Sequence, residues 1–371
     1  NNISSLTIDL PPKNQKGDIS CNIALILAKI NNCAPIKIAE IIKKDLISNF
    51  TEFKNIEIAG PGFLNISFSD KFWKSYLVKI IKLNLRYGSK KNDKKKYNIE
   101  FVSANPTGPL HVGHCRGAVL GDALSNLLSF NGNKIIKEYY VNDYGSQIKN
   151  FVLSVYYRIL EINQNHPFPD KLDLYPGDYI KEIAKKILSK KIFKDFSNIK
   201  KIYKKLELES LKLSIDMIRN NLNLLGIKHD NFVFESNLIN KKIVFKVIKK
   251  LKKNKYIYNG VLEPPKGEKN KDWKTRNQLL FKSTLFGDDV DRPLQKIDNT
   301  WTYFAGDMAY HSNKISRKFD VLINILGSDH AGYIKRIKAA CKAISLNKVN
   351  LICKVSQLVK LFKNGQPFKM S

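Results

Sequence analysis

The chain has 371 residues and carries 64 Lys and Arg against 33 Asp and Glu, a formal net charge of +31 at pH 7. Its 43% apolar and 11% aromatic residues exclude a disordered protein, and no apolar run is long enough for a transmembrane helix. The positive charge makes a polyanion such as RNA, DNA or an anionic membrane surface the first partner to consider, although a general lysine bias would also explain much of it.

Residues 1–88 are predicted to form a small α+β domain. Asp18 or Ser20 can cap a first helix, and a second helix is expected from Pro35 to about residue 50. The segment IEIAGPGFLNISFS then predicts two short strands around the turn residues GPG, and a third helix follows. The lysine-rich run 89–96 is expected to be a linker.

Residues 97–371 are predicted to form a second domain that begins with the order strand, helix, strand. YNIEFVSA predicts a strand over 97–104, apolar residues then recur at helical spacing up to Gly132, and KIIKEYYVN predicts another strand. This order is typical of an α/β fold with a doubly wound parallel sheet. A largely helical insertion is expected at about 151–300. The apolar run VLINIL after it is typical of a strand buried on both faces.

The five cysteines are widely spread and form no CxxC pair, so neither a disulfide framework nor a protein-held metal site is predicted. The first residues contain no apolar core of the signal-peptide kind. A reducing cytoplasm is the compartment that these features favour. Because the chain starts without Met and stops at FKMS, we expect it to be a fragment.

The turn NPTGPLHVGHCRG places two histidines, His111 and His114, where the first strand passes into a helix. In a doubly wound sheet, ligands bind beyond the carboxyl ends of the strands, where helix N-termini offer free N–H groups to anions. An imidazole can donate a hydrogen bond to a phosphate oxygen, and Pro109 and Gly113 let the backbone approach a ligand. The turn therefore predicts a phosphate site. The alternative is that the histidines only cap the turn.

These motifs also resemble those of a known family. HVGH between a strand and a helix is similar to the first signature of class I aminoacyl-tRNA synthetases, and FKMS resembles the first half of their second signature, KMSKS. IEFVSANPTGPLHVGHCRGAVLGDAL and EYYVNDYGSQI resemble arginyl-tRNA synthetases of the bacterial type, and so do GDISCNIALILAK, AGPGFLNISFS, YPGDYI, TYFAGDMAYH and LGSDHAGYIKR. The resemblance covers essentially the whole chain.

The resemblance implies a Rossmann-like catalytic domain that activates L-arginine with ATP to arginyl-adenylate. The enzyme would transfer arginine to the 3′ end of tRNA(Arg) and release AMP and diphosphate, with Mg²⁺ carried by the ATP. It further implies a monomer whose residues 1–88 contact the tRNA, and an anticodon-binding domain that this chain lacks, which leaves activity of the fragment itself open.

The resemblance also assigns the site residues. His111, His114 and Lys369 would be catalytic. The nucleotide would be contacted by His111, Gly113, His114, Gly327, His330, Met370 and Ser371. Arginine would be contacted by Tyr303 and Asp307 at its side-chain end and by Glu100, Ser103, Asn105 and Asp329 nearer its main-chain atoms. A duller explanation of Asp307 is a helix cap. His229 and His311 are interpreted as structural.

Two other functions fit parts of this pattern. Small-molecule nucleotidyltransferases also carry an HxGH turn on a similar sheet, but they are usually compact single domains and would explain neither residues 1–88 nor the insertion. A non-catalytic RNA-binding protein built from synthetase domains would explain the charge, although the nearly complete set of pocket residues argues against it.

Overall fold

The computed structural model describes residues 5–90, 94–262, 276–357, 359 and 361–368. The chain divides into two compact units, Asn1–Ser89 and Lys90–Ser371. None of the helices within the described residues is long and apolar enough to span a membrane.

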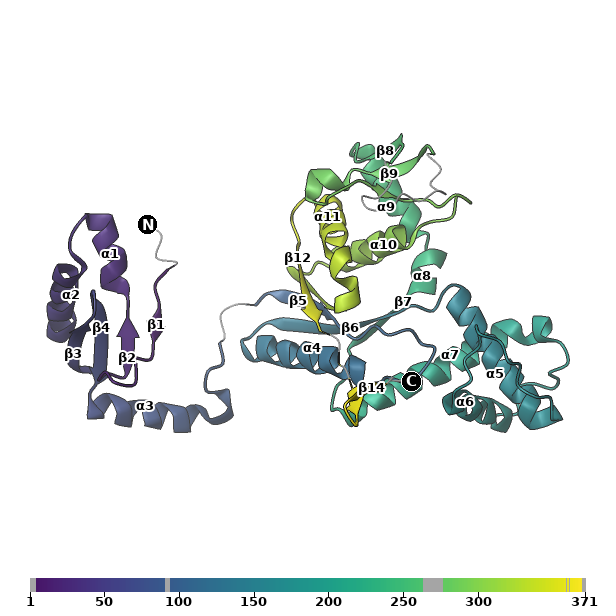
Figure 1. The fold of residues 1–371 in the computed structure, drawn as a ribbon, viewed down its shortest axis with the longest axis horizontal. Coiled ribbons are helices and arrows are strands. Elements are labelled where there is room, and N and C mark those ends of the chain that lie inside the picture. Colours follow the sequence, from purple (N-terminus) through teal and green to yellow (C-terminus); the bar gives the residue numbers. More distant parts are fainter. Residues whose placement is uncertain (1–4, 91–93, 263–275, 358, 360, 369–371) are drawn as a thin grey trace. The chain divides into compact units, whose positions relative to one another are not determined.

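The first unit is a four-stranded antiparallel sheet with helices (Figure 1). Its strands lie in the order β1-β2-β4-β3, and its core is built on Ala24, Ala39, Ile56 and Leu64. Its elements are β1 (Ile8–Asp9), β2 (Ile19–Cys21), α1 (Ile23–Asn31), α2 (Pro35–Asn49), β3 (Phe53–Ala59), β4 (Phe63–Phe68), α3 (Asp70–Leu83) and the 3₁₀ turn η1 (Asn84–Arg86).

The expected cap of the first helix is wrong. Asn22 is the N-cap of α1, whereas Ser20 lies inside strand β2. The Asp18 carboxylate instead accepts a hydrogen bond of 2.7 Å from the Phe68 N–H, so it ties the start of β2 to the end of β4. A short polar side chain serves a strand edge as readily as a helix end, and the sequence alone does not distinguish the two.

The second unit contains a five-stranded, fully parallel sheet in the order β12-β11-β5-β6-β7. These strands are β5 (Lys96–Glu100), β6 (Lys134–Val141), β7 (Asn231–Phe234), β11 (Val321–Gly327) and β12 (Asn350–Ser356). The chain starts in the middle at β5, runs outward to β7, and later returns to the other side at β11. The doubly wound α/β prediction is therefore confirmed, and the strand order reverses between β5 and β11, which is where such sheets bind ligands.

Helices cover both faces of this sheet (Figure 1). One face packs its apolar residues with those of α4 (Val112–Phe130) and α7 (Ile199–Leu224). The other packs with α9 (Ile243–Lys253), α10 (Tyr303–Ser316) and α11 (Ile334–Ser345). The remaining elements are α5 (Ser146–Gln164), α6 (Asp178–Ser189), α8 (Glu235–Asn240), η2 (Ser283–Phe286), η3 (Ser328–Tyr333), the small antiparallel sheet of β8 (Ile257–Gly260), β9 (Gln278–Phe281) and β10 (Arg292–Pro293), and the hairpin of β13 (Leu361–Lys363) and β14 (Gln366–Phe368).

The first strand is shorter than predicted. It ends at Glu100 because Val102 and Ser103 have φ values of 69° and 43°, in the left-handed region that no strand adopts. Helix α4 lies close to this bend, since a Cβ on Gly121 would stand 2.2 Å from Cγ of Phe101. The chain therefore leaves the sheet at Glu100 and turns its next residues across the carboxyl edge.

The expected insertion also differs in the structure. The stretch 151–300 is helical over α5, α6 and α7, but it then returns to the main sheet as β7, which pairs in parallel with β6. The four residues of β7, NFVF, are all half-buried, and their sequence does not alternate between polar and apolar residues. The signal by which a half-buried strand is predicted from sequence is therefore missing. The helical excursion thus ends before β7, and Glu235, which directly follows β7, lines the pocket described below.

Candidate functional site

A pocket of about 610 Å³ opens beyond the carboxyl ends of β5, β6 and β11. It lies at the point where the strand order reverses. Its walls come from the three strand ends, the loop after β5, helices α8 and α10, η3, and single residues of α4 and α11. The lining residues are Glu100, Val102, Ser103, Ala104, Asn105, His114, Tyr140, Asn142, Glu235, Tyr303, Asp307, Tyr310, His311, Asn324, Ile325, Leu326, Gly327, Asp329, His330, Tyr333 and Ile337.

The two histidines of the HVGH turn stand at the N-terminus of α4, and His114 lines the pocket. The Gly113 N–H donates to Nδ1 of His111 at 3.1 Å, and the His111 N–H donates to Nδ1 of His114 at 3.3 Å. Because both Nδ1 atoms accept, each neutral ring carries its proton on Nε2. Burial, and then the neighbouring His111, lower the pKa of His114 to about 4, so this ring is a neutral donor at pH 7.

The histidines therefore do cap α4, as the alternative interpretation held. The capping bonds use only Nδ1, and the Nε2–H groups remain available as donors beside the positive end of the helix. Capping and anion binding are compatible here, because the capping bonds to Nδ1 leave the proton on Nε2, from which it can be donated to a phosphate oxygen.

Two carboxyl groups with raised pKa values face the pocket from α10 and α8. Burial raises the pKa of Asp307 to about 7, against a hydrogen bond from the Tyr333 hydroxyl that lowers it. Burial raises the pKa of Glu235 to about 7 as well, and the charges of Asp307 and Asp143 add to the effect. Two carboxyls that resist ionising next to each other form a site that a bound cation would stabilise.

Asp307 is not a helix cap. It is the fifth residue of α10, whose N-cap is Thr302, with the Ala305 N–H donating to the Thr302 hydroxyl at 3.3 Å. Tyr303 lies at the mouth of the pocket with 76% of its surface exposed, and Lys296 stands over its ring. The tyrosine that contacts Asp307 in the structure is Tyr333.

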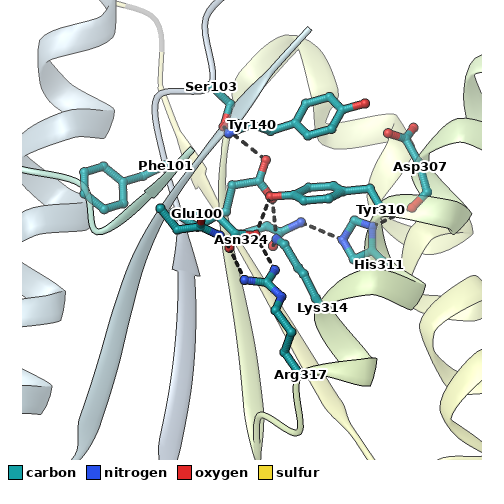
Figure 2. Close-up of polar contacts among 12 residues, drawn as sticks. Glu100, Phe101, Ser103, Tyr140, Asp307, Tyr310, His311, Lys314, Arg317 and Asn324 are labelled. Carbon is teal, nitrogen blue, oxygen red and sulfur yellow. Dashed lines mark hydrogen bonds and ion pairs between the residues drawn. The ribbon is translucent and has the colours of Figure 1, made fainter. Parts of the chain in front are cut away.

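The Glu100 carboxylate at the end of β5 is held on both oxygens (Figure 2). The Ser103 hydroxyl donates to Oε1 at 3.1 Å, and the Lys314 ammonium donates to Oε2 at 2.5 Å. The Tyr140 N–H donates in turn to the Ser103 hydroxyl at 3.0 Å. Nearby, the Asn105 amide donates to Oε1 of Gln147 at 2.8 Å. The left-handed bend at Ser103 is what brings its hydroxyl back to Glu100.

Strand β11 supplies the remaining wall through Gly327 and the start of η3. Asp329 and His330 are exposed, with 3.4 Å between Asp329 Oδ2 and His330 Nε2. A Cβ on Gly327 would stand 2.4 Å from Oδ1 of Asp329, so the glycine leaves room for the Asp329 side chain. This wall is open and polar, unlike the buried base of the pocket.

The structure thus gathers nine of the predicted site residues in one pocket: Glu100, Ser103, Asn105, His114, Tyr303, Asp307, Gly327, Asp329 and His330. His111 and Gly113 are at the helix N-terminus but are not among the lining residues. Lys369, Met370 and Ser371 lie outside the described residues.

The sequence analysis missed several lining residues, chiefly Tyr140, Glu235, Asn324 and Tyr333, and it interpreted His311 as merely structural. Tyr140 lies near the carboxyl end of a predicted strand, which is a usable signal. Glu235 directly follows β7, a strand that the sequence did not reveal.

Comparison with known proteins gives the family. Residues 77–370 match the family model described as tRNA synthetases class I (R), catalytic domain. The chain belongs to this family. Residues 1–68 match a second model, described as arginyl tRNA synthetase N terminal domain. A compact nucleotidyltransferase is therefore excluded.

Among curated relatives, the chain is 52% identical over 372 residues to the arginine–tRNA ligase of Pelagibacter ubique, covering 100% of this chain and 64% of that protein. It is 44% identical over 373 residues to the arginine–tRNA ligase of Roseobacter denitrificans, again covering 100% and 64%. The chain thus spans somewhat less than two thirds of the length of these relatives.

Solved structures show the same fold. The Campylobacter jejuni protein described as an arginyl tRNA synthetase is 33% identical with a TM-score of 0.68, over 82% of this chain and 63% of that one. The arginyl-tRNA synthetase of Thermus thermophilus, 16% identical, has a TM-score of 0.66 over 94% of this chain and 62% of that one, a likeness of fold alone.

Proposed function

We propose that this chain carries the arginine-activating site of an arginine–tRNA ligase. In the proposed reaction the arginine carboxylate attacks the α-phosphate of ATP to give arginyl-adenylate and diphosphate. The arginyl group then passes to the 3′ end of tRNA(Arg), releasing AMP. The observation that carries the proposal is the pocket itself, which has two acids with raised pKa values and the neutral imidazole of His114 from the helix N-terminus among its lining residues.

The acids are the features that fit arginine. A guanidinium is planar, permanently charged and rich in donors, so it pairs best with carboxylates that can accept two hydrogen bonds. Asp307 and Glu235 offer such acceptors. Burial is the main reason that their pKa values are raised, and the charge of Asp307 adds to the effect on Glu235, so a bound cation would favour their ionised forms. Glu100, Ser103, Asn105 and Asp329 would then face the main-chain atoms.

The helix N-terminus would receive the triphosphate. The Nε2–H groups of His111 and His114 would donate to oxygens whose charge changes during the attack, so they would lower the barrier by electrostatic stabilisation. Gly327 and His330, on the open wall, suit the adenosine. Lys369, Met370 and Ser371, which lie outside the described residues, would also contact the nucleotide, with Lys369 as a further cation on the phosphates.

Mg²⁺ would accompany ATP. No cluster of three or more His, Cys, Asp or Glu able to hold a metal ion occurs among the described residues. A magnesium ion prefers oxygen ligands and keeps several waters, so phosphate oxygens would bind it and neutralise their charge.

The direct test is aminoacylation. The complete protein that contains this chain should attach labelled arginine to tRNA only when ATP is present. A protein that binds tRNA and attaches no arginine at any ATP concentration would be the non-catalytic RNA-binding alternative.

Arginine binding should depend on pH. The pKa values of Asp307 and Glu235 are raised to about 7. Below pH 7 the pair therefore has to release a proton before the guanidinium binds, whereas above pH 7 it is already ionised. We expect the KM for arginine to fall about tenfold from about pH 6 to about pH 8, since a single site is bound competitively by a proton and the cation. Steady-state kinetics would measure it. A KM for arginine that stays constant, or rises, over this range would contradict the assignment.

The first unit should contribute to tRNA binding. We propose that residues 1–88 contact the tRNA, in line with their match to an N-terminal domain model. Deleting this unit at Ser89 should raise the Kd for tRNA about tenfold and flatten its salt dependence, because phosphate contacts are lost. The Kd for arginine should not change. Unaltered tRNA binding in filter-binding titrations would refute this role.

We also infer that the protein works in the cytoplasm, where tRNA and ATP are found, and that it is a monomer. Sedimentation equilibrium of the complete protein, at concentrations that bracket its cellular level, tests the second statement.

A further inference from the structure

A buried polar chain of three residues, Lys314, Asn324 and His311, lies at the base of the pocket, where Asn324 and His311 form part of its lining (Figure 2). Lys314 is completely buried, and its ammonium donates to Oε2 of Glu100 at 2.5 Å and to Oδ1 of Asn324 at 3.0 Å. A buried lysine without partners would be very costly, so these two bonds have to be kept in the folded protein.

The chain continues from Asn324 to helix α10. Because the Asn324 oxygen accepts from Lys314, its amide nitrogen faces His311 and donates to Nε2 at 2.9 Å. The Nδ1–H of His311 then donates to the backbone carbonyl of Asp307 at 2.9 Å. Every bond has one donor and one acceptor only if His311 is neutral, and burial together with the charge of Lys314 lowers its pKa to about 3.

The buried chain therefore joins the two ends of the pocket. Asn324 on β11 stands directly beside Glu100 on β5 in the parallel register. Asp307, His311 and Lys314 follow each other at spacings of four and three on α10, so they share one face of that helix. One asparagine thereby holds two successive turns of α10 against the two central strands.

We propose that the buried chain sets the distance between Glu100 and Asp307 and so makes the site selective for the length of the amino acid. The inference rests on the proposed function, in which Glu100 faces the main-chain atoms of arginine and Asp307 faces its guanidinium. His311, Asn324 and Lys314 are thus positioning residues that act through the two carboxylates.

A purely structural role is the competing explanation. In that case, loss of the chain would lower stability and the amount of active protein, and all amino acids would be affected equally. A second anchor keeps α10 in place in either case, since Arg317 donates to the buried Glu138 at 2.5 Å and 2.8 Å. The readout has to be a ratio between two substrates of different length.

The test compares arginine with its homologue that is one methylene longer, using pyrophosphate exchange by the complete protein with tRNA present. The wild type should prefer arginine by roughly 10- to 200-fold, as is usual for one methylene. Asn324→Ala should lose about tenfold of this preference through the KM for arginine, with kcat within about threefold of the wild type. Asn98→Ala is the matched control. Asn98 is a completely buried asparagine on β5 whose amide has no partner within the described residues, and its loss should leave the preference unchanged.

His311 provides a second pair of variants. His311→Ala should lose the preference as Asn324→Ala does, and His311→Gln, which can both accept and donate, should restore most of it. If Asn324→Ala does not fold, the His311 pair decides the question by the same ratio. Wild-type preference in folded Asn324→Ala or His311→Ala overturns the inference alone, whereas a wild type without arginine-dependent exchange overturns the proposed function.

Discussion

Asp307→Asn is expected to lower kcat/KM for arginine by about 10² to 10³-fold. Removing one partner of a buried charge pair costs about 3–5 kcal/mol, because the remaining ion has lost its hydration without compensation. The substitution should not unfold the protein. The Tyr333 hydroxyl can donate to an amide oxygen as it does to the carboxylate, and above pH 7 the ionised Asp307 is itself unfavourable, since its pKa is raised.

The control for Asp307→Asn is Asp122→Asn on α4. Asp122 forms an ion pair of 2.7 Å with Lys137, and neither residue lines the pocket. Its loss should change kcat/KM by less than about threefold, because partly exposed pairs contribute little. A stably folded Asp307→Asn protein with a kcat/KM as high as that of Asp122→Asn would remove Asp307 from the arginine site and weaken the assignments around it.

Replacement of His111 should slow arginine activation far more than it weakens arginine binding. We expect His111→Ala and His111→Ser each to lower the activation rate by about 10² to 10³-fold, as does loss of a single donor to a developing negative charge. The Kd for arginine should stay within about threefold, because the histidine stands at the helix N-terminus and not beside the acids. Pyrophosphate exchange and calorimetry supply the two quantities.

The serine variant separates catalysis from capping. Serine is a good N-cap and should preserve the start of α4, but it places no donor at the distance that Nε2 reaches. If His111→Ser were active and only His111→Ala were slow, the histidine would act through the helix cap. If a His111 variant lost activation rate and arginine affinity equally, His111 would stabilise the ground state as much as the transition state.

Local patterns were enough to predict the core of the fold. The order strand, helix, strand from β5 to β6, the stop of α4 before Gly132 and the buried strand β11 each follow from apolar periodicity and turn residues within a short window. The HVGH turn was placed correctly for the same reason, since the apolar periodicity that starts after it marks the N-terminus of α4.

What the sequence could not provide depends on long-range pairing. Glu235 reaches the pocket only because β7 joins β6, almost a hundred residues earlier in the chain. The bond between Lys314 and Glu100 spans 214 positions, and a lysine in a helix is ordinarily a solvated residue. His311 looked structural because its role depends on Asn324, whose amide sits within an otherwise apolar strand.

The most direct test of the account is pyrophosphate exchange by the complete protein, with tRNA, for arginine, lysine and neutral citrulline. Citrulline keeps the shape of arginine and lacks its charge, whereas lysine keeps the charge and lacks the planar fork. Arginine alone should support rapid exchange, with lysine and citrulline poorer in kcat/KM by roughly 10⁴-fold, because each leaves buried acceptors of Asp307 and Glu235 unpaired. Exchange with citrulline or lysine at a rate near that of arginine would contradict an acidic guanidinium site.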